Sequence, residues 1–167
     1  MHIPLAHRGY TLIETLVYIG VFVLVAMALV VTFLSFDTVF LRNNTERIVI
    51  NEAQTSLEYI AQAIRQADSV NTGLSTFDNP SGVLVLNEGA TSTRIYMSGG
   101  AVMLEVEGTS VGPLTSDAVT VDAITFNHYV GTITDLVRVS LTLSAQNKAA
   151  STTRTFYTSG VLRGSYE

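Results

Sequence analysis

The chain has 167 residues, of which 47% are hydrophobic and only 14% are charged. It is long enough for one domain of ordinary size with a compact core, and too apolar for a disordered polymer. With 9 Lys and Arg against 14 Asp and Glu, the formal net charge of -5 argues against the basic surface of a nucleic-acid-binding protein. The absence of cysteine excludes disulfides, thiol catalysis and cysteine metal ligands.

An apolar segment near the start of the chain is long enough to cross a membrane. Residues 15–36 contain no Asp, Glu, Lys or Arg, and as a helix they would span roughly 33 Å, against about 30 Å for a hydrocarbon core. A cleaved secretory signal has a shorter apolar region of about 7 to 15 residues, so we expect this segment to stay in the mature protein. Arg8 before the segment, against Asp37 and then Arg42 after it, favours a cytoplasmic N-terminus by the few charges present.

Helical character continues beyond the apolar segment. Neither Pro nor Gly occurs in residues 21–72, which predicts one helix over about 11–70, ended by Gly73 in a left-handed conformation. In residues 44–70, apolar side chains recur at spacings of three and four, so this half is predicted to be amphipathic and to pack on a domain. The expected buried positions are Val49, Ala53, Leu57, Ile60, Ile64 and Ala67.

After Gly73 the pattern changes from helix to strand. Segments rich in Val, Ile, Thr, Tyr and Phe predict strands over residues 83–86, 93–98, 101–106, 119–129, 136–145 and 152–162. Ser98-Gly99-Gly100 indicates a tight hairpin turn, and residues 108–113 a loop. Alternation is clearest in residues 136–144, where it predicts one inward apolar face made of Val137, Val139, Leu141 and Leu143. We therefore predict an α+β fold, in which the amphipathic half of the helix completes the core of a small antiparallel β-sheet domain.

The junction before the apolar segment carries a recognisable motif. Arg8-Gly9-Tyr10-Thr11-Leu12-Ile13-Glu14, followed by an uncharged run, resembles the processing signature of type IV prepilins and type II secretion pseudopilins. In that family a membrane-embedded peptidase cuts after the Gly and methylates the new amine. The resemblance implies cleavage between Gly9 and Tyr10 and N-methylation of Tyr10, which stands where the family most often has Phe.

The resemblance also implies a domain organisation and a function. Residues 1–9 would be a cleaved leader peptide, 10–43 a transmembrane or filament-core half-helix, and 44–167 a periplasmic or extracellular domain of type IV pilin-like fold. The protein would be a structural subunit of a type IV pilus or type II secretion-like filament. The absence of proline from the apolar run favours a minor pilin or pseudopilin, and looser likenesses elsewhere suggest the J or W type.

The same resemblance implies partners and a location. The expected partners are prepilin peptidase, other pilin or pseudopilin subunits, an inner-membrane assembly platform and membrane lipid. No nucleic acid and no cofactor are expected for this subunit alone. The subunit would first span the cytoplasmic membrane of a prokaryotic cell with its N-terminus inside, and then join an extracytoplasmic filament.

Glu14 is the candidate assembly residue. A carboxylate near an apolar run of membrane length costs about 2.5 to 3.5 kcal/mol or more near the middle of a bilayer and is normally paired. The family resemblance implies a partner, namely the N-terminal amine of a neighbouring subunit. The alternative is that Glu14 lies in the headgroup layer and merely extends to water. Gly9 also has an alternative interpretation: without the motif it would be only a flexible joint before the helix.

A search for catalytic and metal-binding sets finds no convincing candidate, and we expect no enzyme activity. His128 has no assignable partner and is expected to be a surface or turn residue. Asp117, Asp122 and Asp135 could in principle form an oxygen-rich Ca²⁺ site, but their spacing matches no known loop motif and solvated carboxylates are preferred. A phosphate-binding loop leads from a strand into a helix, whereas the glycines of residues 99–112 lie between predicted strands.

One other function accounts for part of the sequence. The chain could be a single-pass, membrane-anchored extracytoplasmic β binding module with an uncleaved signal anchor. That hypothesis explains the apolar segment and the strands, but it leaves the Thr11-Leu12-Ile13-Glu14 block accidental.

Overall fold

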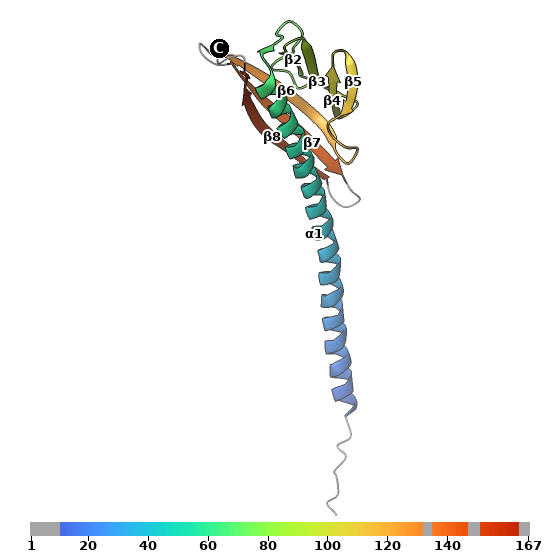
Figure 1. Cartoon of the computed structure of the whole chain (residues 1–167). Coiled ribbons are helices and arrows are strands. Elements are labelled where there is room, and N and C mark those ends of the chain that lie inside the picture. The colour runs from blue at the N-terminus through green and yellow to red at the C-terminus, as the bar shows by residue number, and fades with distance from the viewer. Residues whose placement is uncertain (1–10, 132–134, 147–150, 164–167) are drawn as a thin grey trace, which may run out of the picture. The chain divides into compact units, whose positions relative to one another are not determined.

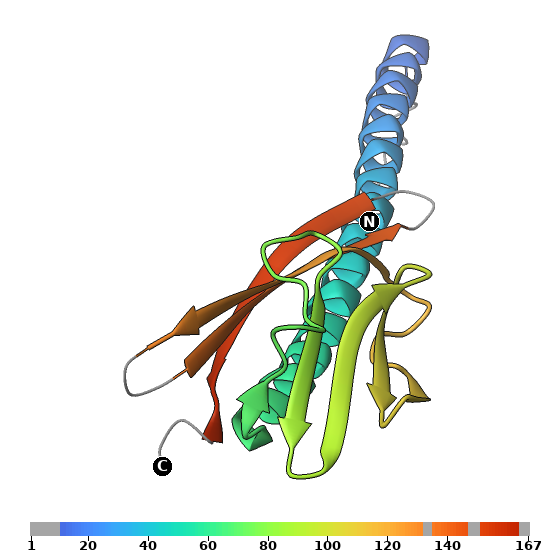
Figure 2. The ribbon, with the colours of Figure 1, turned by 90° about the horizontal axis from the view of Figure 1, so that it is seen from above.

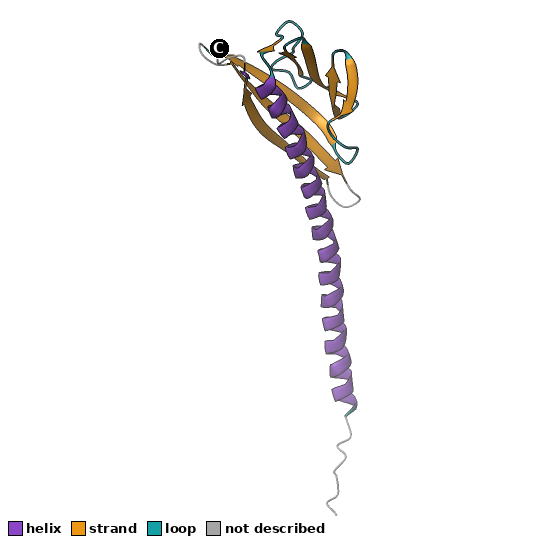
Figure 3. Cartoon of the chain, viewed as in Figure 1, coloured by secondary structure: helices purple, strands orange, loops and turns teal. Residues whose placement is uncertain are grey.

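The computed structural model describes residues 11–131, 135–146 and 151–163, with side chains except those of residues 36–42. The chain divides into two compact units, Met1–Phe40 and Leu41–Glu167. The described residues form one helix and eight strands, whose arrangement is shown in Figure 1. The predicted α+β layout with antiparallel sheets is confirmed (Figure 3).

The helix α1 comprises Leu12–Gln66. Its N-terminus is capped by Thr11, whose hydroxyl accepts a hydrogen bond from the backbone N–H of Glu14 at 3.3 Å. The predicted stop at Gly73 is wrong. The helix ends earlier because the chain that follows pairs with a strand: the N–H of Asp68 donates to the carbonyl of Asn87 at 2.8 Å, and that of Asn71 to the carbonyl of Val85 at 2.9 Å.

In the second unit, the helical part of the chain is amphipathic as predicted. The side chains predicted to face the domain are all buried and belong to one core cluster with residues of the strands, namely Val49, Ala53, Leu57, Ile60, Ile64 and Ala67. Polar contacts also fix this part of the helix. The Glu52 carboxylate accepts hydrogen bonds from the N–H and hydroxyl of Ser116 at 3.0 and 2.8 Å, and the Ser56 hydroxyl donates to the carbonyl of Leu114 at 3.1 Å.

The first sheet has five antiparallel strands in chain order. Its strands are β1 (Ser69–Val70), β2 (Val83–Glu88), β3 (Thr91–Ser98), β4 (Ala101–Val106) and β5 (Thr109–Pro113). The predicted hairpin at Gly99 and Gly100 is confirmed, with φ of 60° and 77°. The loop predicted over residues 108–113 is wrong, because Glu107 and Gly108 both adopt positive φ and turn the chain directly into β5.

The second sheet has three antiparallel strands, β6 (Thr120–Val130), β7 (Asp135–Gln146) and β8 (Ser151–Val161). The predicted antiparallel β-sheet domain is therefore built from two sheets. The two sheets appear as separate groups of strands beside the C-terminal part of α1 in Figure 2. The alternation predicted for β7 is confirmed, since its inward side chains are all fully buried, namely Val137, Val139, Leu141 and Leu143.

Helix α1 and the second sheet approach each other closely at a glycine. A Cβ added to Gly160 of β8 would lie 2.7 Å from Cγ2 of Ile64 and 3.4 Å from the carbonyl oxygen of Ala61. Real Cβ atoms do not approach other heavy atoms this closely, so only glycine fits here without displacing the helix.

Candidate functional site

The first unit presents an apolar helical surface. Leu12–Ser35 is long and apolar enough to cross a membrane, and none of it is buried within the protein. Its large hydrophobic side chains are each more than half exposed. An exposed apolar surface of this size is typical of a site that contacts lipid or another protein chain.

The hydroxyl groups of this apolar segment are mostly satisfied by the helix itself. Thr15, Thr32 and Ser35 each donate a hydrogen bond to the backbone carbonyl four residues earlier, at 3.4, 2.8 and 2.9 Å. Such bonds let a hydroxyl lie in an apolar medium without another partner. These three side chains therefore do not mark a polar site.

Glu14 differs from them. It lies in the first turn of α1 and is partly exposed, and its Oε1 accepts a hydrogen bond from the hydroxyl of Tyr18 at 3.2 Å. Within the described part of the chain, no Lys, Arg or His forms an ion pair with Glu14. The processing residues Gly9 and Tyr10 lie outside the described residues.

Sequence reasoning missed Tyr18. The signal was its position four residues after Glu14, a spacing that brings two side chains together on one face of a helix. In an apolar run, a tyrosine is read first as another hydrophobic residue, and its hydroxyl is easily overlooked.

His128 is not the surface or turn residue that the sequence predicts. Its side chain is only 9% exposed, its Nε2 lies 3.4 Å from Oδ2 of Asp135, and its ring centroid is 5.4 Å from that of Phe77. The predicted strand over residues 119–129 already contains His128, but the sequence did not show which residues lie beside its side chain. In the structure these are Phe77 and Asp135, and Val137 of β7 lies opposite His128. Nε2 is buried without a hydrogen-bond partner among the described residues.

The three aspartates considered for Ca²⁺ are not brought together by the sheet. Asp122 accepts a hydrogen bond from the Ser144 hydroxyl at 3.1 Å near one end of the β6–β7 pair, whereas Asp135 lies at the other end, opposite Val130. Asp117 is exposed in the loop before β6. In the residues that the structure describes, no group of three His, Cys, Asp or Glu side chains could hold a metal ion.

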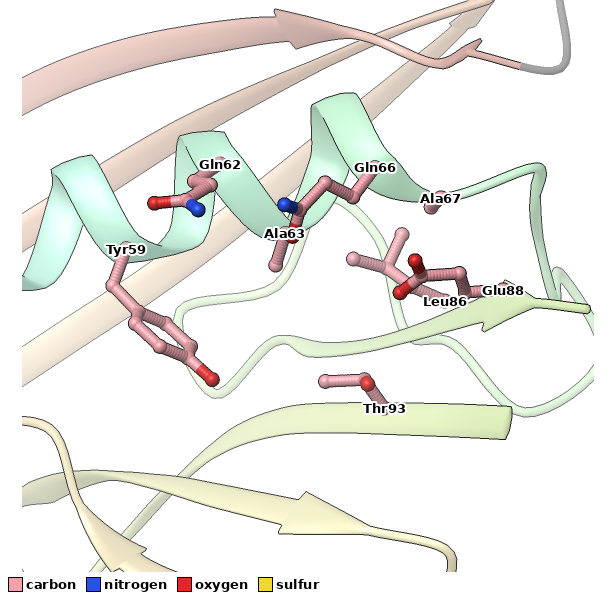
Figure 4. Close-up of a pocket in the computed structure, with 8 residues that line it drawn as sticks. All are labelled: Tyr59, Gln62, Ala63, Gln66, Ala67, Leu86, Glu88 and Thr93. Carbon is pink, nitrogen blue, oxygen red and sulfur yellow. The ribbon is translucent and has the colours of Figure 1, made fainter.

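A small pocket lies between α1 and strands β2 and β3 (Figure 4). Its volume is about 120 Å³, room for a few water molecules. Tyr59, Gln62 and Gln66 of the helix face Glu88 and Thr93 of the strands across it. The lining includes no nucleophile with an adjacent base, so the pocket does not suggest a catalytic site.

Comparisons with protein-family models, with curated proteins and with solved structures gave no match. The features that bear on function are therefore the motif, the apolar helix and the contacts of Glu14.

Proposed function

We propose that this protein is a structural subunit, a minor pilin or pseudopilin, of a type IV pilus or type II secretion-like filament. The observation that carries the proposal is the position of Glu14. It is the only charged residue between Arg8 and Asp37, and it lies in the first turn of a helix whose exposed apolar surface is long enough to cross a membrane.

Two environments follow for the apolar part of α1. Before assembly it lies in the cytoplasmic membrane with the N-terminus inside, and after assembly it packs against the corresponding helices of other subunits. The Glu14 carboxylate then pairs with the N-terminal amine of a neighbouring subunit. This pairing removes two charges that an apolar filament core would otherwise hold uncompensated.

Processing by prepilin peptidase creates that amine. The enzyme would cut between Gly9 and Tyr10, remove residues 1–9 and methylate Tyr10. The domain formed by residues 44–167 would then lie outside the membrane and coat the filament. In this proposal the subunit acts through assembly, with an inner-membrane platform as its further partner, and carries no catalytic site of its own.

Substitution of Glu14 tests the proposal, because processing and assembly place different demands on it. In cells that contain the peptidase and the assembly system, Glu14→Ala should be cleaved normally yet remain in the membrane. Glu58→Ala, which removes an exposed carboxylate from the same helix outside the apolar segment, is the matched control and should assemble normally.

The assay combines the cleaved fraction of the subunit with the number of filaments and the amount of subunit that each contains. For a subunit that initiates filaments, the defect should appear as fewer filaments. If Glu14→Ala is incorporated at the wild-type level into normal numbers of filaments, Glu14 has no part in assembly and the proposal loses its main support.

A further inference from the structure

Tyr18 is distinguished from the other polar residues of the apolar segment by its hydrogen-bond partner. The hydroxyls of Thr15, Thr32 and Ser35 bond to the backbone of their own helix. That of Tyr18 instead donates to a side chain, the carboxyl group of Glu14, at 3.2 Å. Tyr18 is 58% exposed, so its ring lies on the apolar surface of the helix rather than in a core.

Glu14 also takes part in the cap at the start of the helix. A Glu at the third position after a capping threonine commonly bonds back to the backbone N–H of the capping residue. Here the first half of that arrangement is present, because the Glu14 N–H bonds to the Thr11 hydroxyl at 3.3 Å. The carboxyl group instead bonds in the other direction along the helix, to Tyr18 one turn later.

We propose that Tyr18 is a positioning residue for Glu14: its hydroxyl holds Oε1 while the subunit lies in the membrane and leaves Oε2 to receive the amine of the next subunit. A carboxyl group has acceptor sites on both oxygens, so the two partners do not compete. The assembly step of this inference rests on the proposed function. The hydrogen bond between Tyr18 and Glu14 does not depend on that function.

The consequence is that one conformer of Glu14 is selected before the neighbouring subunit arrives. Without the hydroxyl, the Glu14 side chain samples several conformers and bonds to other groups in the headgroup layer. The amine of the next subunit must then fix one conformer of Glu14 when it binds, which costs conformational entropy. Capture of a subunit should therefore become less efficient without any change in leader cleavage.

Tyr18→Phe tests this inference, because it removes one hydroxyl and keeps the ring. Thr32→Val is the matched control, since it removes a hydroxyl of the same apolar segment that bonds only to the backbone. We expect both full-length variants to be cleaved normally. Incorporation of Tyr18→Phe into filaments should fall about fivefold, as the loss of one hydrogen bond implies, while Thr32→Val should match the wild type.

A spectroscopic measurement separates positioning from packing. With the full chain in phospholipid vesicles, the infrared band of the Glu14 carboxyl group is assigned by its loss in Glu14→Ala. The band should shift in Tyr18→Phe and stay in place in Thr32→Val. An unshifted band in Tyr18→Phe would show that the hydroxyl does not bond to Glu14. A shifted band with normal incorporation would show that the bond does not aid assembly, and either result overturns the inference.

The two proposals fail in different ways. If Glu14→Ala assembles normally, the proposed function fails whatever Tyr18 does. If Glu14→Ala is blocked and Tyr18→Phe assembles like the wild type, the filament function stands and only the role of Tyr18 is lost.

Discussion

Gly160→Ala should weaken the contact between α1 and β8. The added Cβ would lie 2.7 Å from Cγ2 of Ile64 and 3.0 Å from its Cβ, both in a fully buried side chain. A β-branched side chain on a helix has one strongly preferred rotamer, so Ile64 cannot simply turn away. The helix must shift instead, and overpacking of this kind typically lowers the free energy of unfolding by about 1 to 3 kcal/mol.

The partner substitution provides an internal check. Ile64→Ala alone should cost about 2 to 5 kcal/mol, because it leaves a cavity beside Gly160. In the double variant the new methyl group enters that cavity, so the combined loss should be smaller than the sum of the two single losses by about 1 kcal/mol or more. The size of this difference measures the contact directly.

Urea unfolding of residues 44–167 is the assay, with Gly73→Ala as the control. A Cβ at Gly73 would meet only Oδ1 of Asn71 at 3.6 Å, an ordinary contact, so this variant should stay within about 0.5 kcal/mol of the wild type. Two results would refute the reasoning: Gly160→Ala as stable as Gly73→Ala, or fully additive losses in the double variant.

Three further predictions concern the domain, the buried histidine and the leader. Residues 44–167 should form a soluble, folded monomer in gel filtration and circular dichroism, whereas a chain starting at Gly73 should not fold, because it lacks the buried face of α1. A folded chain from Gly73 would remove α1 from the core. His128→Phe keeps a ring beside Phe77 but removes an Nε2 that makes no hydrogen bond and lies 3.4 Å from Oδ2 of Asp135. Because the Asp135 side chain is partly exposed and can turn to water, the free energy of unfolding in urea should change by less than about 1 kcal/mol; a loss above about 2 kcal/mol would contradict this. Gly9→Trp should leave the precursor uncut on immunoblots, and normal cleavage would contradict the assigned junction.

The periodic elements could be predicted from the sequence. The buried face of α1 in the second unit and the inward side chains of β7 follow from spacings of three to four and of two, and both are fully buried as expected. These patterns are strong because a whole face of each element packs on one core.

The irregular elements could not be predicted because their partners are distant in sequence. β1 exists only because residues 69 and 70 pair with Asn87 and Leu86 of β2, which replaces the expected last turn of helix. β5 depends on Glu107 adopting a positive φ, which glutamate rarely does and which no sequence pattern announces.

The candidate site also has one part that the sequence predicts and one that it does not. The sequence singled out Glu14 because a lone carboxylate in an apolar run is conspicuous. The spacing of four residues allows Tyr18 to reach that carboxyl group, but whether the hydrogen bond forms depends on the side-chain conformers within the helix, which the sequence does not specify. The burial of His128 likewise depends on side chains from other segments, Phe77 and Asp135, which the strand pattern does not reveal.

The central claim, that this chain is processed and assembled as a pilin-like subunit, is tested most directly by the N-terminus of the mature protein. Mass spectrometry of the subunit purified from cells that contain prepilin peptidase should find a chain that begins at Tyr10 and carries one methyl group on its amine. A protein that retains Met1 in the assembled or membrane-anchored form would contradict the claim. So would a chain that begins beyond Phe36.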